Sequence, residues 1–426
     1  MSKYLIMGNS AAAVGAIEAI RKTDREGPIT VVSDEPYVAY SRPLISYLLG
    51  RLVDESRMPL RDEDFYARNG VEALLGVEAT AVRPATKEVE VEDGSRLGYQ
   101  RLLVACGGVP IRPPFMEDAV EGVFNFTTWD DARAIAAYIE REGVTRAVVL
   151  GGGLIGLKAT EALIERRIRT TVVELADRVL SLTFDKKASQ LVEQALRTAG
   201  CELITGNTVF DPRQRNGKIS GVVLREGGTV DCELLIVAIG VRPNLEPVRE
   251  AGLNLDRGIV VDRQMRTSME DIYAAGDVTQ AYDLLSAEQR TIAIWPNAML
   301  QGRVAGANMA GTEAHYDGGL AMNAVEIAGV PTISVGVTDP TGQDYEVMTR
   351  ADEQNGTYKK VVIKDDTVVG SIFVGDISRA GIITGLIRDR ANVALFKDKL
   401  LRDDFGLVWL PKDYRKHLVE GPGMEV

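Results

Sequence analysis

Residues 147–156 read AVVLGGGLIG, a short apolar strand that runs into a turn of closely spaced glycines. The residues after this turn favour a helix, and a second apolar strand, residues 170–173, then ends at Glu174. A strand, a glycine turn, a helix and a second strand closed by an acid form the context that a dinucleotide-binding fingerprint requires. The sequence therefore predicts a Rossmann-like nucleotide-binding unit around this stretch.

The three glycines and the acid of this fingerprint each have a different physical role. Gly151 permits the tight turn, Gly153 lets the backbone approach a pyrophosphate, and Gly156 lets the helix pack closely on its strand. The N-terminus of the helix then offers N–H groups and partial positive charge to the phosphates. Glu174 is suited to the 2′-hydroxyl of a ribose and would repel a 2′-phosphate, so we expect NADH to be preferred over NADPH. Arg178 is the one nearby cation that could oppose this preference.

A second unit of the same kind lies near the N-terminus, where an apolar strand again precedes a loop of small residues. Gly8, Ser10 and Ala13 stand where the other unit has its three glycines, and their small side chains still allow a close approach. The acid is displaced along the chain, so Glu35, with Asp34 as the less favoured alternative, is expected to reach the ribose. The chain is thus predicted to contain two nucleotide-binding units.

Composition and charge exclude several classes of protein. The chain has 426 residues, of which 45% are hydrophobic and 26% charged, as in ordinary globular proteins. Its net charge of −12 argues against nucleic acid and anionic membranes as partners. No apolar run approaches the ~18 residues of a membrane span, and no signal peptide is visible, so we expect a cytoplasmic protein.

The cysteines and histidines are too few for a metal or cluster site. Cys106, Cys201 and Cys232 cannot supply the four thiolates of an ordinary iron–sulfur cluster, and they form no C-x-x-C motif. The two histidines, His315 and His417, offer little to a metal centre or a nucleophile–histidine pair. We therefore expect no metal, and any redox chemistry must be carried by a bound organic cofactor.

Four further motifs follow in order along the chain: LLVACGGVP (102–110), LLIVAIGVRPN (234–244), IYAAGD (272–277) and WPNAMLQG (295–302). Their order and spacing resemble the two-dinucleotide flavoproteins of the pyridine nucleotide–disulfide oxidoreductase superfamily, from residue 1 to about residue 325. Residues 358–390 resemble the C-terminal domain of NADH:rubredoxin oxidoreductases and of the flavin module in assimilatory nitrite reductases. Similar flavin subunits also occur in 2-oxoacid oxidoreductase complexes such as phenylglyoxylate dehydrogenase.

The resemblance implies an α/β protein with two Rossmann-like (ββα-type) dinucleotide-binding domains and a C-terminal α+β domain. The FAD-binding domain would be split into residues 1–112 and 245–325, with an NAD-binding domain, residues 113–244, inserted between them. Residues 326–426 would form the C-terminal domain that covers the flavin or makes an interface.

The resemblance also implies which residues contact the two cofactors, FAD and NAD. Asp277 would bond to the ribityl–pyrophosphate region of FAD, the alternative being a helix cap after a buried strand. Arg42 and Pro43 would lie beside the isoalloxazine and phosphates, the alternative for Arg42 being a solvated loop residue. The full set for FAD is Gly8, Ser10, Ala13, Glu35, Arg42, Pro43, Ala105, Gly107, Gly276, Asp277 and Pro296. The set for NAD is Gly151, Gly153, Ile155, Gly156, Glu174 and Gly240.

Two departures from the family pattern bear on the chemistry. The segment that carries a redox cysteine in disulfide reductases reads SRPLISY here (residues 41–47), so reduction through a thiol is not expected. The family's glutamate near the nicotinamide is replaced by Lys158, and the lysine near flavin N5 is replaced by Tyr47. We hypothesise that Lys158 provides the positive charge that stabilises the reduced anionic flavin. The alternative is a helix-surface lysine paired with Glu161 or Glu165.

The resemblance implies that the protein moves electrons between NAD(H) and an external one-electron carrier, by hydride transfer at flavin N5. The carrier would be a rubredoxin, a ferredoxin or an iron–sulfur subunit, and the direction of flow is open. The chain could be the NAD-reducing subunit of a larger 2-oxoacid oxidoreductase complex, or a homodimer. Two alternatives are a free-standing NADH oxidase or small-molecule reductase, and a non-catalytic nucleotide-binding subunit.

Overall fold

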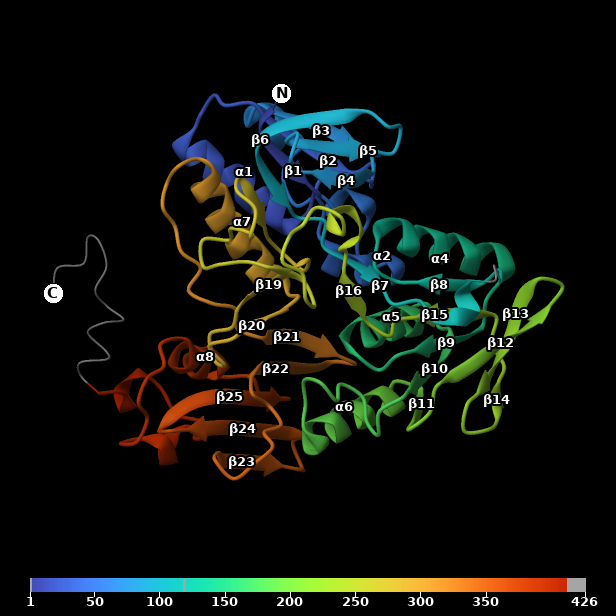
Figure 1. Ribbon diagram of the computed structural model, residues 1–426. Helices are drawn as coiled ribbons and strands as arrows, with labels where there is room; N and C mark the ends of the chain where they lie inside the picture. The colour runs from blue at the N-terminus through green and yellow to red at the C-terminus, as the bar shows by residue number, and fades with distance from the viewer. Residues whose placement is uncertain (1, 118–119, 412–426) are drawn as a thin grey trace. The chain divides into compact units, whose positions relative to one another are not determined.

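The computed structural model describes residues 2–117 and 120–411 (Figure 1). The chain divides into two compact units, each made of two segments. Unit 1 comprises Met1–Val173 and Thr208–Leu320, and unit 2 comprises Glu174–Asn207 and Ala321–Val426. Residues 412–426, which the sequence assigned to the C-terminal domain, lie outside the described part of the chain.

A mostly parallel sheet forms the first half of unit 1. Its order is β3 (Val71–Leu75), β2 (Ile29–Ser33), β1 (Ser2–Met7), β6 (Arg96–Val104), β5 (Glu88–Val91) and β4 (Ala79–Arg83), and β18 (Ile272–Ala274) also pairs with β6. β1, β2, β3, β6 and β18 pair in parallel, whereas β4, β5 and β6 form an antiparallel meander. The apolar runs of β1 and β2 are buried, as parallel strands covered on both faces require.

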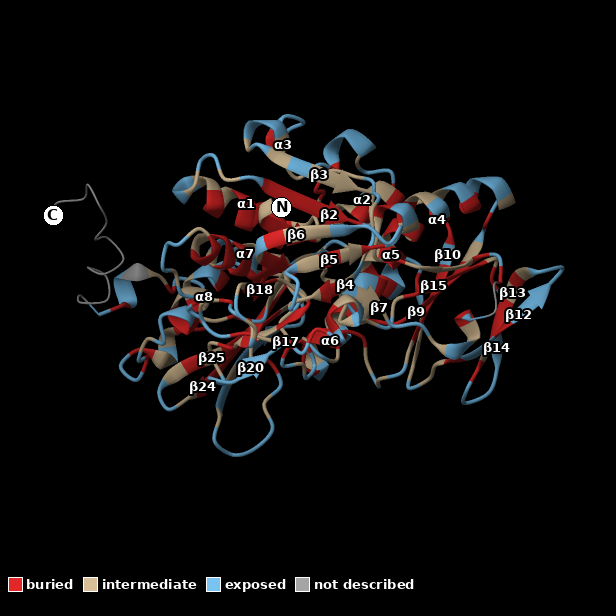
Figure 2. Ribbon diagram, turned by 45° about the horizontal axis from the view of Figure 1, so that its top comes forward, coloured by how far each residue is buried: buried red, intermediate tan, exposed pale blue. Residues whose placement is uncertain are grey.

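Two helices, α1 (Ala11–Thr23) and α7 (Trp295–Met309), lie side by side against this sheet although almost 300 residues of chain separate their starts (Figure 1). They approach so closely because small residues face each other. A Cβ atom placed on Gly302 would lie 2.0 Å from the carbonyl oxygen of Ala12. Figure 2 shows buried residues concentrated in β2 and α7, which belong to the largest apolar core of the chain.

A second parallel sheet in unit 1 contains, in order, β10 (Arg169–Glu174), β9 (Arg146–Leu150), β15 (Leu234–Val237) and β8 (Val123–Asn125). The helix α5 (Leu154–Glu165) connects β9 to β10, and α4 (Trp129–Glu142) follows β8. The side chains of Thr128 and Asp131 form a capping box at the start of α4, and Gly143 ends it in the left-handed conformation.

Short elements complete unit 1. Its remaining helices are α2 (Ile45–Leu49) and α3 (Phe65–Arg68), with 3₁₀ turns at Arg42–Leu44, Glu55–Arg57, Pro114–Met116 and Glu246–Val248. The remaining strands pair as β7 (Gly108–Pro110) with β16 (Val241–Pro243), β12 (Val209–Arg215) with β13 (Lys218–Leu224) and β14 (Thr229–Val230), and β17 (Ile259–Val260) with β19 (Thr279–Tyr282) and β20 (Gln289–Arg290).

Unit 2 is built around an antiparallel sheet of order β21 (Met322–Ile327), β22 (Val330–Gly336), β25 (Thr367–Val374), β24 (Thr357–Lys364) and β23 (Glu346–Asp352). The helices α6 (Lys186–Thr198) and α8 (Ala380–Arg388) pack against strands of this sheet. The unit also contains β11 (Glu202–Thr205) and 3₁₀ turns at Lys397–Lys399 and Leu407–Trp409. Residues 174–207 are thus grouped with the C-terminal part of the chain.

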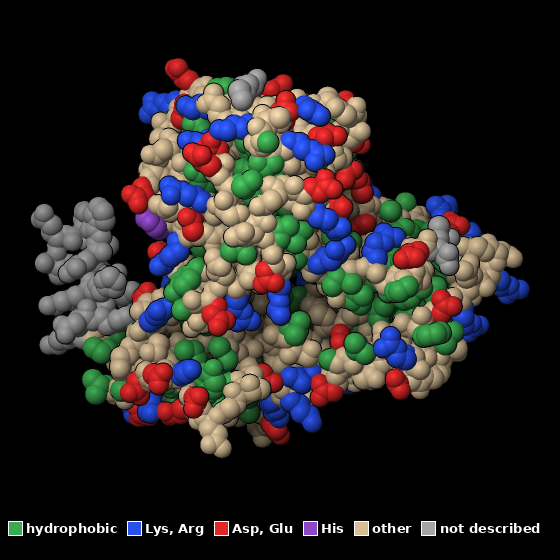
Figure 3. All heavy atoms as spheres, in the orientation of Figure 1, with side chains coloured by type: hydrophobic (Ala, Val, Ile, Leu, Met, Phe, Trp, Pro, Cys, Tyr) green, Lys and Arg blue, Asp and Glu red, His purple; other side chains and the backbone are tan. Residues whose placement is uncertain are grey.

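The predicted α/β class, with two Rossmann-like parts and a C-terminal α+β part, is confirmed. The three-domain boundaries remain a prediction. Among the described residues, no helix is both long enough and apolar enough to cross a membrane. On the face drawn in Figure 3, acidic and basic side chains are interspersed, so the excess of acid does not gather there into one patch.

Candidate cofactor site and family

The two nucleotide-binding turns of unit 1 have the same construction. Gly8 follows β1 with φ +110°, and Gly151 follows β9 with φ +113°, both in a region that favours glycine. A Cβ on Gly8 would lie 2.2 Å from the carbonyl oxygen of Ala105, and one on Gly151 would lie 2.3 Å from that of Ala238. Each turn therefore passes tightly against the end of a neighbouring strand, and a side chain is excluded at both positions.

The helices that follow these turns fit a pyrophosphate. α1 begins after Ser10 and α5 begins after Gly153, and neither residue caps its helix with a side chain. Neither helix has an acid in its first turn, and a Cβ on Gly153 would meet nothing within 4 Å. Helix N-termini built this way can direct N–H groups and positive partial charge at phosphate. Gly156 lets α5 close on its strand, since a Cβ there would lie 2.0 Å from the carbonyl oxygen of Gly151.

At the end of β2, the predicted ribose ligand Glu35 is held by two donors. Tyr40 donates its hydroxyl to Glu35 at 2.6 Å, and the Arg42 guanidinium donates to the other carboxylate oxygen. The backbone N–H of Trp129 donates to the Tyr40 hydroxyl at 3.1 Å, and Arg42 also donates to the carbonyl oxygen of Thr127 at 3.0 Å. Burial raises the pKa of Tyr40 above its usual range. Tyr40 lies two residues before Arg42, and no motif in the sequence gave it a role.

Asp277 follows β18 at the turn that the IYAAGD motif predicts. Burial raises the pKa of its carboxyl, and the positive charge of Arg42 acts against this rise. Gly276 has φ +87°, and its N–H donates to the Oε1 atom of Gln301 at 2.8 Å. The Thr279 hydroxyl donates to the same oxygen at 3.1 Å. Gln301, from α7, thus fixes the turn, a role that its place in the WPNAMLQG motif did not predict.

Tyr47 and Lys158 come together in unit 1. The ammonium of Lys158 lies 4.8 Å from the centre of the Tyr47 ring, within the range of a cation–π contact. It also pairs with Glu161, three residues along α5, at 2.6 Å. The side chains of Lys158 and Glu161 are 21% and 20% exposed. The structure therefore joins the two residues that replace the family's acid and base, while their role at the flavin remains a prediction.

Cys106 is a partly buried residue whose thiol is held by a neighbouring carbonyl group. Its sulfur donates to the carbonyl oxygen of Asn244 at 3.2 Å, and burial raises its pKa to about 12. Cys201 and Cys232 are buried, and burial raises the pKa of Cys232 to about 12. A thiol with such a pKa is not a nucleophile at neutral pH. Among the described residues, no group of three or more potential ligands is placed to hold a metal ion.

Glu174 is the last residue of β10 and the first residue of unit 2. One oxygen of its carboxylate accepts the N–H of Ala176 at 2.7 Å. The N–H groups of Gly206 and Asn207 donate to the carbonyl oxygens of Ala176 and Glu174, at 2.7 and 3.1 Å. These contacts fix the carboxylate at the end of the strand, where the sequence predicts a ribose contact.

The other predicted contact residues lie at turns or helix starts. Ala13 lies in the first turn of α1, and Ile155 in that of α5, where it is 37% exposed. The rest are Pro43 in the 3₁₀ turn Arg42–Leu44, Ala105 and Gly107 after β6, Gly240 after β15, and Pro296 at the start of α7. Gly107 and Gly240 have positive φ values, of +65° and +116°.

Comparison with known proteins identifies the family that this geometry belongs to. Residues 2–302 match the family of pyridine nucleotide-disulphide oxidoreductases, and residues 322–391 match the rubredoxin NAD+ reductase C-terminal domain. The chain belongs to the pyridine nucleotide–disulphide oxidoreductase family. It is an NAD(H)-dependent flavoprotein oxidoreductase whose cofactors are FAD and NAD.

Individual relatives cover most of the chain. It is 36% identical to the NADH-dependent phenylglyoxylate dehydrogenase subunit epsilon of Aromatoleum evansii, over 94% of both chains. It is 31% identical to a rubredoxin-NAD(+) reductase of Pseudomonas putida, over 72% of this chain and 80% of that one. Among solved structures, a NAD-dependent persulfide reductase from A. fulgidus has a TM-score of 0.85 at 28% identity, over 92% of this chain and 77% of that chain.

Proposed function

We propose that this chain passes electrons between NAD(H) and an external one-electron carrier of the iron–sulfur or rubredoxin type, without a redox cysteine. The observation that carries the proposal is the lack of a usable thiol. Residues 41–47, SRPLISY, contain no cysteine. Desolvation raises the pKa of the Cys106 thiol to about 12, and the thiol already donates to a carbonyl oxygen. Electrons that reach the flavin would therefore leave to another molecule.

The relatives support a protein carrier and favour membership of a larger complex. One relative is named as a subunit of an NADH-dependent phenylglyoxylate dehydrogenase, and the alignment spans 94% of each chain. Others are named as reductases of rubredoxin and putidaredoxin, and one solved neighbour is a covalent putidaredoxin reductase–putidaredoxin complex. We infer that this chain is the NAD-linked subunit of a 2-oxoacid oxidoreductase complex, whose iron–sulfur subunit would be its partner.

The residues of this chain would bind and orient the two cofactors. The turns at Gly8 and Gly151, with the N-termini of α1 and α5, would hold the two pyrophosphates. Glu35 and Glu174 would accept hydrogen bonds from ribose hydroxyls. When bound, FAD supplies a hydride acceptor at N5 and can release electrons singly. Because no general base or nucleophile is required of the protein, positioning would be its main contribution.

An anaerobic titration of the FAD-loaded protein with NADH, and separately with NADPH, tests the proposal. Bleaching of the flavin by NADH, followed by reoxidation on adding a ferredoxin, a rubredoxin or the cluster-bearing subunit, is the expected result. Rapid reoxidation by dioxygen or a quinone, with none by the protein carriers, would instead identify a small-molecule reductase. If NADH does not bleach the flavin, photoreduction followed by NAD+ would show whether electrons run toward NAD+.

Lys158 would place a positive charge beside the flavin ring. Replacing it in Lys158→Met should lower the two-electron flavin potential by about 30 mV, which equals about 1.4 kcal/mol. Lys158→Arg keeps the charge and should restore most of the potential. Lys22→Met, at an exposed position in the last turn of α1, is the matched control. An unchanged potential and an unchanged rate of flavin reduction in Lys158→Met would show that Lys158 is only a helix-surface residue.

A further inference from the structure

The loop that follows Glu174 carries one cation, Arg178, in an acidic setting. Residues 174–185 read ELADRVLSLTFD. Arg178 donates to its neighbour Asp177 at 2.9 Å and to Asp339 at 3.0 Å. Its side chain is only 20% exposed, whereas those of Asp177 and Asp339 are 70% and 52% exposed. Both ends of the guanidinium fork are therefore occupied by carboxylates.

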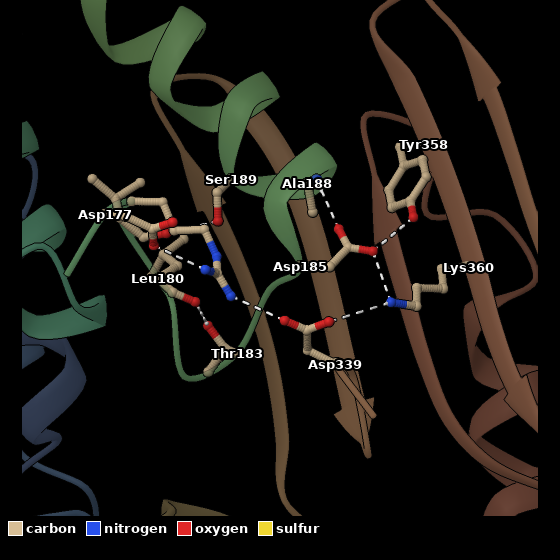
Figure 4. A network of polar contacts seen from close by, with 11 residues as sticks. Asp177, Leu180, Thr183, Asp185, Ala188, Ser189, Asp339, Tyr358 and Lys360 are labelled. Atoms are coloured by element: carbon tan, nitrogen blue, oxygen red, sulfur yellow. Dashed lines mark hydrogen bonds and ion pairs between the residues drawn. The ribbon is translucent and has the colours of Figure 1, made fainter. Parts of the chain in front are cut away.

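Asp339 reaches Arg178 from a distant part of the sequence. It lies in the loop after β22, within the same unit as residues 174–207. Its other carboxylate oxygen lies 4.0 Å from the ammonium of Lys360, which in turn binds Asp185 at 2.8 Å (Figure 4). Asp339 thus lies between two cations, and its shorter contact, a hydrogen bond of 3.0 Å, is with Arg178.

We propose that Asp339 strengthens the preference for NAD(H) over NADP(H), by holding the guanidinium that would otherwise bind a 2′-phosphate. The inference rests on the proposed function, in which Glu174 binds the ribose at the adenosine end of NAD(H). An arginine close to that acid is the usual group that accepts a 2′-phosphate in dinucleotide-binding domains. Arg178 stands four residues after Glu174, but two carboxylates neutralise it, so the loop rejects the phosphate.

The negative charge of Asp339 can be removed by a substitution that keeps the size of the side chain. In Asp339→Asn the shape of the side chain is kept, but the guanidinium retains only the adjacent, exposed Asp177 as a charged partner. Because Asp339 is half exposed, water screens its charge and limits the effect. We expect the dissociation constant for NADP+ to fall about fivefold, which is about 1 kcal/mol, and that for NAD+ to change by less than about twofold.

Calorimetric titration of the oxidised FAD-loaded protein with NAD+ and with NADP+ tests this directly, because neither nucleotide reacts with oxidised flavin. Asp339→Asn should tighten NADP+ selectively. In an Arg178→Gln background, adding Asp339→Asn should have no further effect, since the proposed role of Asp339 acts through the guanidinium. Asp339→Glu should return the wild-type preference. Asp365→Asn, exposed in the same unit with a left-handed φ of 49° that asparagine accepts, is the matched control.

The outcomes separate this inference from the proposed function. Wild-type protein that binds NAD+ tightly and NADP+ weakly supports the proposed function. If Asp339→Asn then changes both affinities equally, or neither, the role of Asp339 is overturned while the proposed function stands. The same holds if the gain in NADP+ affinity persists without Arg178, because it then arises elsewhere. Wild-type protein that binds neither nucleotide would overturn both.

Discussion

Lys360→Met is expected to destabilise unit 2 strongly, because it breaks a buried ion pair. Asp185, the residue before α6, accepts hydrogen bonds from the Lys360 ammonium at 2.8 Å, the Tyr358 hydroxyl at 2.7 Å and the Ala188 N–H at 3.0 Å (Figure 4). The side chains of Lys360 and Asp185 are 6% and 12% exposed. Lys360→Met leaves a buried carboxylate with two neutral donors and no cation at bonding distance.

The expected cost follows from this geometry. Removing one partner of a buried ion pair typically costs 3–5 kcal/mol, roughly, because the other charge stays buried without compensation. Since Asp185 keeps two donors, we expect about 3 kcal/mol. Asp185→Asn retains a residue suited to the helix cap and should cost less. In the double variant neither charge remains, so the total cost should fall below the sum of the single costs by about 2 kcal/mol.

Hydrogen exchange measured by mass spectrometry, on peptides from α6 and β24, reports the local stability that this pair controls. Lys187→Met is the matched control. Lys187 also lies on α6 and pairs with Glu353 at 2.7 Å, but these side chains are 37% and 80% exposed, so its loss should cost about 0–1 kcal/mol. A cost of Lys360→Met no larger than that of Lys187→Met would refute the reasoning.

The pH dependence of stability provides an independent test of how the Asp185 carboxylate contributes to the fold. Burial alone would raise the pKa of Asp185, but hydrogen bonds from Lys360, Ala188 and Tyr358 outweigh it and hold the pKa below its usual value. Its stabilising contribution is therefore present above the unfolded pKa of about 3.9 and is lost as the pH falls through the lower folded value. The penalty of Lys360→Met should shrink over that acid range, because a protonated Asp185 no longer needs a cation.

Two further predictions concern the nucleotide turn at Gly151 and the thiol of Cys106. Gly151→Ala places a Cβ 2.3 Å from the carbonyl oxygen of Ala238 at φ +113°, so NAD+ affinity measured by calorimetry should fall at least about tenfold, with FAD retained. Gly143→Ala, whose Cβ meets nothing within 4 Å, should bind NAD+ normally, and equal affinities in the two variants would contradict the assignment. Cys106→Ser should leave the rate of flavin reduction by NADH unchanged from about pH 7 to 9, because a thiol of pKa about 12 is neutral there. A loss of electron transfer in this variant would mean that the thiol carries electrons.

Local sequence patterns predicted the parts of the site that are built from neighbouring residues. The turn at Gly151 and its helix are read from one short stretch, because the backbone conformation of the turn demands glycine at fixed spacing. The turn at Gly8 was also predicted, although its partner positions are only small residues. The contact between Tyr47 and Lys158 was not predicted, because the resemblance gave each residue a place near the cofactors but no contact between them.

The features that sequence reasoning missed join segments far apart in the chain. Gln301 holds the turn at Gly276 from another helix, and the Tyr40 hydroxyl orients Glu35 while accepting an N–H from α4. Asp339 reaches Arg178 across 161 residues of sequence. A glutamine, a tyrosine or an aspartate in a loop has no distinctive local pattern, because its role depends on a partner that only the tertiary fold supplies.

Two cations, Lys158 and Arg178, are both paired with acids, and the two pairings differ in how far the acids are exposed to water. Lys158 is paired with Glu161 on its own helix, and these side chains are only 21% and 20% exposed. The acids beside Arg178, Asp177 and Asp339, are 70% and 52% exposed, so water screens both pairs and the effect expected for Asp339→Asn is only about fivefold. Under the proposed function, Glu161 would hold the Lys158 ammonium where reduction of the flavin creates an anion. Asp339 would hold the Arg178 guanidinium away from a 2′-phosphate.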